Sequence, residues 1–157
     1  MCGIFGFSLV RELDTSDVAI GLKQLDSLSH RGPDGCGHEA FHKQGVFIGH
    51  RRLAILDTSD RASQPMSRDR FTVAHNGEIY NFVELRQRIG EGKFNTRSDC
   101  EIPLLLFEHQ RGKFAEDLRG MYAVSILAGD TGEVYPVSYT HLRAHETLPS
   151  LVWRLGR

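Results

Sequence analysis

Short apolar segments separated by glycine-rich breaks constrain the fold of this chain more than any other feature. Segments of period two or of continuous apolar character predict strands, and segments of period 3.6 predict helices. The two kinds of element come in blocks and not in a regular strand–helix alternation, so the pattern predicts an α+β fold with antiparallel sheets. The predicted strands lie within residues 2–9, 45–56 (two segments), 71–75, 121–127 and 133–135, and the predicted helices within 15–29, 82–89 and 98–110.

Local signals predict how these elements begin and end. Thr15 or Ser16 is expected to cap the first helix, Asn81 the second and Ser98 the third. Residues 30–37 (HRGPDGCG) contain three glycines and a proline and are expected to form a loop.

Composition excludes several classes of function. The chain has 157 residues, which fits one domain, and its net charge of -1 argues against nonspecific nucleic-acid binding. No apolar run is long enough to span a membrane, and residues 2–10 lack the flanks of a signal peptide, so a cytoplasmic protein is expected. Neither type of glycine-rich phosphate loop is present.

Three cysteines are spaced too widely for a zinc site or a redox dithiol, and no metal site is expected. Cys36 and Cys100 are expected to be small buried hydrophobic residues. Cys2 differs, because removal of Met1 would make it the first residue and give one residue both a thiol and an α-amino group. An α-amino group titrates at roughly pH 7.7–8.0 and can act as a base toward the thiol. A Met-Cys start alone is weak evidence, since it also occurs without any function.

Six segments in order strengthen the case for Cys2. They are MCGIFGF (1–7), SHRGPDG (29–35), GHRRLAILD (49–57), QPM (64–66), HNGEIYNFVELR (75–86) and TRSDCE (96–101). The start of the chain resembles that of class II glutamine amidotransferases, and the order and spacing of all the segments resemble the glutamine-hydrolysing asparagine synthetases. The resemblance covers residues 2–135 and implies the four-layer αββα sandwich of the N-terminal-nucleophile hydrolases, here incomplete at its C-terminus.

The resemblance implies that Cys2 is the catalytic nucleophile and that Asn76 and Gly77 hold the oxyanion. Amide hydrolysis passes through a tetrahedral oxyanion that needs two hydrogen-bond donors. Asn76 offers a side-chain N–H, and Gly77 offers a backbone N–H at a turn. Taken without the resemblance, Asn76-Gly77 is the strongest hairpin-turn signal in the chain and would be interpreted as only a turn.

Glutamine binding is assigned to Arg52, Glu78 and Asp99 on the same resemblance. A planar guanidinium suits the α-carboxylate of glutamine, and a carboxylate suits its α-ammonium. Arg51 and Arg52 are neighbours in a predicted strand and must face opposite sides, so only one can enter the pocket. Without the resemblance, an arginine pair is a solvated strand face and an aspartate at a helix start is a cap.

Two neighbouring segments receive weaker assignments. His30 and Arg31 lie in a loop that could close over the substrate, but neither is assigned a catalytic role. Pro103 falls early in the third helix, where the family usually has an aliphatic residue. Proline cannot donate to the carbonyl of Asp99. The helix should therefore begin near Ile102 or be kinked, and displacement of Asp99 would weaken glutamine binding.

The domain organisation follows from where the resemblance ends. Residues 2–136 are expected to form the amidotransferase domain, and residues 137–157 have no clear period and are expected not to be native. The synthetase domain, which would bind ATP and Mg, is absent, and no cofactor is expected in the amidotransferase domain. The expected partners are L-glutamine, the chain's own synthetase domain and a second copy in a homodimer.

Three alternatives stay open. The amide acceptor could be aspartate, a sugar or another carboxylate. The chain could be an amidase for a substrate other than glutamine, or an inactive fragment.

Overall fold

A computed structural model describes residues 2–139 and the backbone of residues 151–155. The α+β prediction is confirmed, because the described chain forms two four-stranded sheets with three α-helices and every strand pair except β1–β8 is antiparallel. The strands are β1 (Gly3–Ser8), β2 (Gly35–Phe41), β3 (Val46–Arg52), β4 (Met66–Arg68), β5 (Phe71–Ile79), β6 (Gly120–Ala128), β7 (Val134–Tyr139) and β8 (Leu151–Leu155). The helices are α1 (Thr15–Asp26), α2 (Phe82–Ile89) and α3 (Ile102–Gln110), with 3-10 helices at Asp60–Ala62, Glu91–Lys93, Asp99–Glu101 and Arg111–Asp117.

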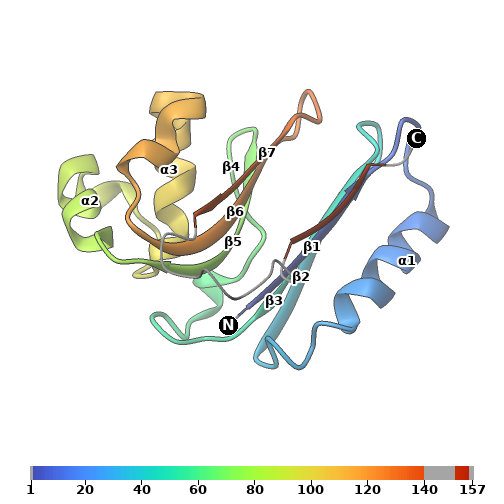
Figure 1. The fold of residues 1–157 in the computed structure, drawn as a ribbon, viewed down its shortest axis with the longest axis horizontal. Coiled ribbons are helices and arrows are strands. Elements are labelled where there is room, and N and C mark those ends of the chain that lie inside the picture. The colour runs from blue at the N-terminus through green and yellow to red at the C-terminus, as the bar shows by residue number, and fades with distance from the viewer. Residues whose placement is uncertain (1, 140–150, 156–157) are drawn as a thin grey trace.

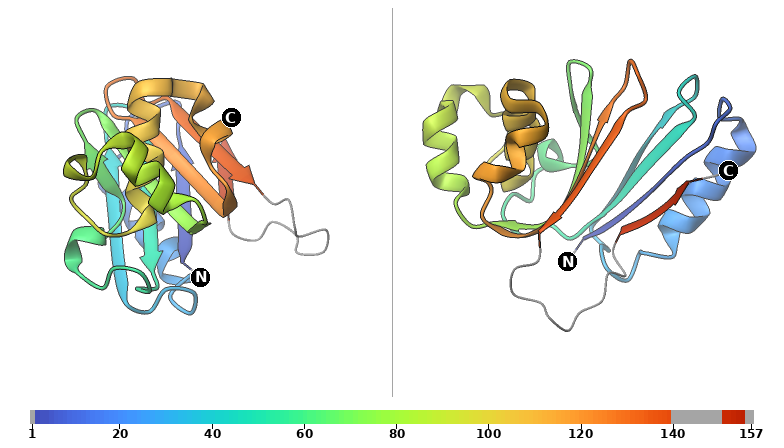
Figure 2. Two further views of the ribbon diagram at one scale, coloured as in Figure 1. Left: turned by 90° about the vertical axis from the view of Figure 1, so that its left-hand side faces the viewer. Right: turned by 45° about the horizontal axis from the view of Figure 1, so that its top comes forward.

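The two sheets face each other, and helices lie on their outer faces (Figures 1 and 2). One sheet has the order β2-β3-β1-β8 and the other β4-β5-β6-β7. Helix α1 packs on the outer face of the first sheet against β1 and β3, and α3 packs on the outer face of the second sheet against β5. The start of β1 lies at the end of the molecule where the two sheets come together (Figure 1).

Apolar side chains fill both the space between the sheets and the space under the helices of the second sheet. Between the sheets, Ile4, Val46 and Ile48 pack against Ala74 and Leu127. Val73, Ile79 and other residues on the opposite face of β5 pack beneath α3. Because side chains alternate along a strand, even-numbered residues of β1, β3 and β5 face the other sheet. This parity decides which polar residues meet in the inner layer.

Helix α1 begins with a capping residue that differs from the prediction. Asp14, and not Thr15 or Ser16, is the N-cap, and its carboxylate accepts hydrogen bonds from the N–H groups of Ser16 and Asp17 at 2.8 and 3.0 Å. A carboxylate at this position forms a capping box with Asp17, which outcompetes a cap one residue later.

Several strand boundaries differ from those predicted. Residues 45–56 contain one strand and not two, because β3 covers only Val46–Arg52, and the predicted loop 30–37 overlaps the first residues of β2. The Asn76-Gly77 pair lies inside β5 and is not a hairpin turn, so that interpretation was wrong. Pairing of Gly77 with Tyr122 continues the sheet through this point, and the strand continues to Ile79. Tertiary pairing therefore overrides the local turn preference here.

Helix α3 begins as one of the two predicted alternatives. The side chain of Ser98 accepts a hydrogen bond from the N–H of Cys100, and a 3-10 turn over Asp99–Glu101 leads into the α-helix at Ile102. The Ile102 N–H donates to the Asp99 carbonyl, which is the carbonyl that Pro103 cannot serve. The chain therefore accommodates Pro103 in the first turn of α3.

Helix α2 has the predicted bounds, but its cap works differently. Asn81 occupies the N-cap position without a side-chain capping bond. Its side chain instead donates to the Asp117 carbonyl and accepts from the Arg119 N–H, each at 2.9 Å. Asn81 thus ties the start of α2 to the segment that enters β6.

The remaining predictions concern the cysteines and the end of the chain. Cys100 is buried as predicted, whereas Cys36 is exposed on β2, an outer strand of its sheet, so that prediction was wrong. Although residues 137–157 show no clear period in the sequence, residues 137–139 complete β7 and residues 151–155 form β8. The rest of that segment and Met1 lie outside the described residues. Within the described part of the chain, no helix has the length and apolarity needed to cross a membrane.

Candidate active site

The thiol of Cys2 lies at the end of β3, where the chain leaves the sheet. The Leu53 N–H donates to the Cys2 sulfur at 3.3 Å, and the sulfur lies 3.7 Å from the Leu53 carbonyl oxygen. The predicted loop contributes too, because Arg31 Nε donates to the Cys2 carbonyl at 3.2 Å. Asp34 holds the next peptide by accepting from the Ala54 N–H at 2.9 Å. Cys2 is half-buried, and its backbone and sulfur are both held in place.

The two adjacent arginines point to opposite sides of the first sheet, as predicted. Arg51 donates to the Leu25 carbonyl at 3.3 Å and pairs with Asp26, so it packs against α1 on the outer face. Arg52 lies on the inner face and donates to the carbonyl oxygens of Asp57 and Ser59, the latter at 2.9 Å. Only Arg52 is therefore on the side of the sheet that carries Cys2.

Asn76 lies on the face of β5 that is directed toward the first sheet, and Gly77 follows it in the strand. Asn76 is 5% exposed and shares the inner face with Ala74, and its side-chain oxygen has no hydrogen-bond partner among the residues that the structure describes. Gly77 has a φ of 127°, and a Cβ there would lie 2.0 Å from the Met121 carbonyl oxygen. Only glycine can occupy this position without moving β6.

The alternation of β5 fixes the direction of the Gly77 N–H. The Tyr80 N–H donates to the Arg119 carbonyl at 2.7 Å, so even-numbered residues direct their backbone groups toward β6. The N–H groups of His75, Gly77 and Ile79 consequently point to the other edge of β5. Strand β4 pairs only as far as Val73, so this edge carries no strand partner beyond that residue among the described strands.

Side chains accept hydrogen bonds from the N–H groups of His75 and Ile79, the two residues that flank Gly77 along this edge. The His75 N–H donates to Gln64 Oε1 at 2.6 Å, and the Ile79 N–H donates to Asp99 Oδ2 at 2.8 Å. Along the strand, the Gly77 N–H lies between these two bonds. Asn76 and Gly77 therefore offer a side-chain donor on the inner face and a backbone donor at the neighbouring edge of β5, and an oxyanion site requires two such donors.

The two predicted carboxylates differ in exposure. Asp99 is 4% exposed and also accepts from the Ser98 hydroxyl at 3.3 Å. Glu78 is exposed, two residues from Asn76, and its side chain has no hydrogen bond or ion pair with the described residues. His30 is also exposed and bonds only its own turn, with Nδ1 3.0 Å from the Ser27 carbonyl oxygen.

Asp57 connects the loop that binds Arg52 with the segment that leads to Asp99, although the sequence motifs gave it no predicted role. Its carboxylate accepts from the Arg97 N–H at 2.8 Å, and that bond, with those from Ser59, lowers the pKa of Asp57 to about 2. Because its carbonyl also binds Arg52, Asp57 ties the Arg52 loop to the segment that leads to Asp99. A carboxylate directly after the apolar run 53–56 was the available sequence signal.

The predicted residues therefore fall into two groups on facing sheets. Cys2 and Arg52 belong to the first sheet, and the second sheet supplies Asn76, Gly77 and Glu78, with Asp99 against its β5. β5 contacts both β1 and β3. Within the described residues no group of three or more His, Cys, Asp and Glu side chains could hold a metal ion.

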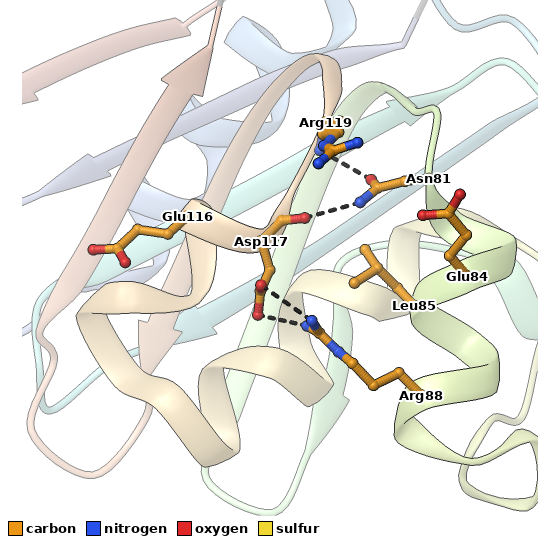
Figure 3. A pocket seen from close by; sticks show the side chains of 7 residues that line it. All are labelled: Asn81, Glu84, Leu85, Arg88, Glu116, Asp117 and Arg119. Atoms are coloured by element: carbon orange, nitrogen blue, oxygen red, sulfur yellow. Dashed lines mark hydrogen bonds and ion pairs between the residues drawn. The ribbon is translucent and has the colours of Figure 1, made fainter.

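A pocket of about 230 Å³ lies elsewhere, between α2 and the start of β6 (Figure 3). Arg88 pairs with Asp117 at 2.5 Å, and Asn81 bonds Asp117 and Arg119. These polar groups serve each other, and none of the predicted site residues lines the pocket. These contacts hold α2 against the segment that enters β6, and we do not assign the pocket a catalytic role.

Comparison with known proteins identifies the family. The family model described as "Glutamine amidotransferase domain" matches residues 1–137. The chain is 41% identical over 133 residues to asparagine synthetase [glutamine-hydrolyzing] 1 of Bacillus subtilis and 35% identical over 148 residues to asparagine synthetase B [glutamine-hydrolyzing] of Escherichia coli. It is 31% identical over 161 residues to the second Bacillus subtilis enzyme. The chain belongs to the glutamine amidotransferase domain family, as its motifs indicated.

The matches are unequal in coverage. They cover 80%, 90% and 94% of this chain but only 20%, 26% and 21% of those relatives. The chain therefore spans about a fifth to a quarter of the length of the relatives it matches.

Proposed function

We propose that this chain hydrolyses L-glutamine to glutamate and ammonia through a thioester on Cys2, and that in a full-length asparagine synthetase the ammonia amidates aspartate. One observation carries the proposal. The Asn76 amide and the Gly77 N–H lie together on β5, opposite the sheet whose end holds the Cys2 sulfur. The family membership supports the same chemistry.

The proposed reaction uses the two groups of residues in turn. Arg52 binds the α-carboxylate of glutamine, and Glu78 and Asp99 bind its α-ammonium. With Met1 removed, the α-amino group of Cys2 accepts the thiol proton, and the thiolate attacks the side-chain carbonyl carbon. Asn76 and Gly77 stabilise the oxyanion while the proton passes to the departing amine, which leaves as ammonia. Water then adds to the thioester, which frees glutamate and restores the thiol.

The wider assignments rest on the family. We infer the four-layer αββα sandwich of the N-terminal-nucleophile hydrolases, with the amidotransferase domain over residues 2–136. ATP and Mg would bind in a synthetase domain, which would be the partner that receives ammonia, and the amidotransferase domain itself would use no cofactor. We also infer a cytoplasmic protein that forms a homodimer.

Hydrolysis is tested by measuring ammonia and glutamate released from L-glutamine. The wild-type chain should release both in equal amounts, and Cys2→Ala should abolish the release. Ammonia release that survives Cys2→Ala would refute the site. Cys100→Ala is the matched control, because Cys100 is buried and its thiol pKa is raised to about 12 by that burial.

The substrate class is tested separately with Arg52→Ala. If the substrate is glutamine, loss of the α-carboxylate partner should raise KM strongly. Retained KM together with activity on simple amides would instead favour an amidase. The amide acceptor is tested by joining the chain to its synthetase domain and offering aspartate, a sugar or another carboxylate.

The segment 137–157 is proposed not to be native. The match to the family model ends at residue 137, which supports this division, whereas the alignments to two relatives cover 90% and 94% of the chain and extend past that residue. Sequencing the source gene through and beyond the Tyr135 codon tests it. A reading frame that departs from residues 137–157 supports the proposal, and one that encodes them contradicts it.

A further inference from the structure

A buried histidine of the first sheet forms a hydrogen bond with the backbone of the second sheet. His50 in β3 is 0% exposed, and its Nε2 lies 3.0 Å from the carbonyl oxygen of His75 in β5. A carbonyl oxygen can only accept, so the proton of the neutral ring lies on Nε2. Burial lowers the pKa of His50 to about 4, which keeps the ring neutral near pH 7.

Both ends of this bond adjoin the site. His50 precedes Arg52 by two residues on the same inner face, and Leu53, which contacts the Cys2 sulfur, follows directly. The acceptor carbonyl belongs to the peptide group that joins His75 to Asn76. Because that peptide group is planar, the orientation of its carbonyl also fixes the positions of the backbone nitrogen and Cα of Asn76.

No neighbouring strand holds this peptide in place at the edge, among the strands that the structure describes. β4 pairs with β5 only as far as Val73, so the backbone groups of His75 on that edge depend on side chains. Gln64 accepts from the N–H at 2.6 Å, and His50 donates to the carbonyl at 3.0 Å. Loss of the His50 donor would free the carbonyl, and the peptide could rotate.

We propose that His50 is a positioning residue, which holds the Asn76 amide and the Gly77 N–H at the oxyanion position relative to Cys2. The inference deepens the proposed function and rests on it. Oxyanion donors act because they are fixed in advance, and a displacement of about 1 Å can cost on the order of 100-fold in rate. His50 itself does not touch the substrate.

Two substitutions separate the hydrogen bond from simple space filling. His50→Gln keeps an amide N–H near the position of Nε2, whereas His50→Leu fills similar space without a donor. We expect His50→Leu to lower kcat for glutamine hydrolysis about 10- to 100-fold, with little change in KM. His50→Gln should keep most of the wild-type kcat.

A second readout distinguishes positioning from general damage. Alkylation of Cys2 by iodoacetamide is a displacement at an sp³ carbon and forms no oxyanion, so its rate should be equal in wild type and His50→Leu. Equal kcat in wild type and His50→Leu would overturn the proposal. A parallel loss of kcat, KM and alkylation rate in both variants would overturn it as well, because a structural role alone explains that result.

A third readout needs no turnover and separates this proposal from the proposed function. In NMR spectra, the His75 carbonyl, the Gly77 amide and the Asn76 side-chain amide should shift in His50→Leu and return in His50→Gln. Unchanged resonances would overturn the positioning role. A wild-type chain without glutaminase activity would contradict the proposed function, and the NMR comparison would then decide for or against His50.

Discussion

At the scale of single residues, two adjacent arginines illustrate how a strand assigns different tasks to like side chains. Arg51 is held on the outer face by Asp26 and the Leu25 carbonyl. Arg52 lies on the inner face, near Cys2, with the carbonyl oxygens of Asp57 and Ser59. Strand alternation alone therefore decides which arginine can reach a substrate.

Arg52→Ala should weaken glutamine binding while Arg51→Ala should not. A hydrogen-bonded charge partner contributes about 1.5–3 kcal/mol, so we expect the KM for glutamine to rise roughly 10- to 150-fold in Arg52→Ala. Arg51→Ala loses contacts with α1 and should lower the melting temperature without a comparable change in KM. Steady-state kinetics and thermal melts of both variants test this, and equal KM values in the two variants would contradict the assignment.

The buried His50 also predicts how stability depends on pH. Its pKa is about 4 in the folded chain and 6.5 in its ordinary state, so the unfolded chain binds more protons between these values. The free energy of unfolding should be fully developed above pH 6.5 and should fall as the pH drops toward 4, by on the order of 3 kcal/mol from this group. The nearby Arg52 and the His75 ring lower the pKa further in the same direction.

Denaturant titrations between pH 4 and 7 measure this dependence. His50→Gln lacks the titrating ring, so its free energy of unfolding should change less with pH over this window than that of the wild type. Groups that do not interact with His50 are common to both proteins and cancel in the comparison. Parallel curves would show that the His50 ring does not titrate as inferred.

At the scale of elements, β5 depends on one glycine. Gly77→Ala would force a φ of 127° on a side chain and bring its Cβ within 2.0 Å of the Met121 carbonyl oxygen. Strain and overpacking together should lower the free energy of unfolding by at least about 3 kcal/mol. Gly112→Ala is the control, since nothing lies within 4 Å of its Cβ position, and it should change stability by less than about 0.5 kcal/mol. Equal destabilisation in urea titrations would contradict this account.

Pro103 lies in the first turn of α3, where we predicted that it would displace Asp99 and weaken glutamine binding. Proline prevents an α-helical bond to the Asp99 carbonyl, and a 3-10 turn serves that carbonyl instead. If the altered turn displaces Asp99, Pro103→Ile should allow the usual turn and lower the KM for glutamine. An unchanged KM in that variant would show that Asp99 already has its binding position.

The elements show where sequence reasoning succeeds and where it fails. The bounds of α2 and the capping role of Ser98 follow from local chemistry and were predictable. Asn76-Gly77 misled, because the same two residues that favour a hairpin turn also tolerate a distorted strand, and only pairing with β6 distinguishes the two. The predicted N-cap of α1, Thr15 or Ser16, was wrong because neighbouring polar residues compete for the position and Asp14 occupies it.

The site was predictable to a different degree. Motif resemblance predicted Cys2 and Arg52, because each lies in a run of distinctive residues. It could not predict the hydrogen bonds of His50 and Asp57, since their partners are backbone groups of β5 and of the segment before Asp99, which are distant in the sequence. Contacts across facing sheets have no sequence period, so only the three-dimensional arrangement reveals them.

At the scale of the whole molecule, the candidate site exists because two sheets face each other. One sheet supplies the thiol and Arg52, and the other supplies the donors of β5, while His50 and Asp57 link the two halves. Because the candidate residues are divided in this way, neither sheet alone carries all of them. This division also means that the central claim concerns Cys2, since every other assignment is a role in the reaction proposed at that thiol.

The most direct test is mass spectrometry of the chain after reaction with a glutamine analogue that carries an electrophilic diazoketone in place of the amide. The account predicts one adduct, on a Cys2 that has become the N-terminal residue, blocked by excess L-glutamine and lost in Cys2→Ala. Labelling of Cys36 or Cys100 instead, or labelling that persists in Cys2→Ala, would contradict it.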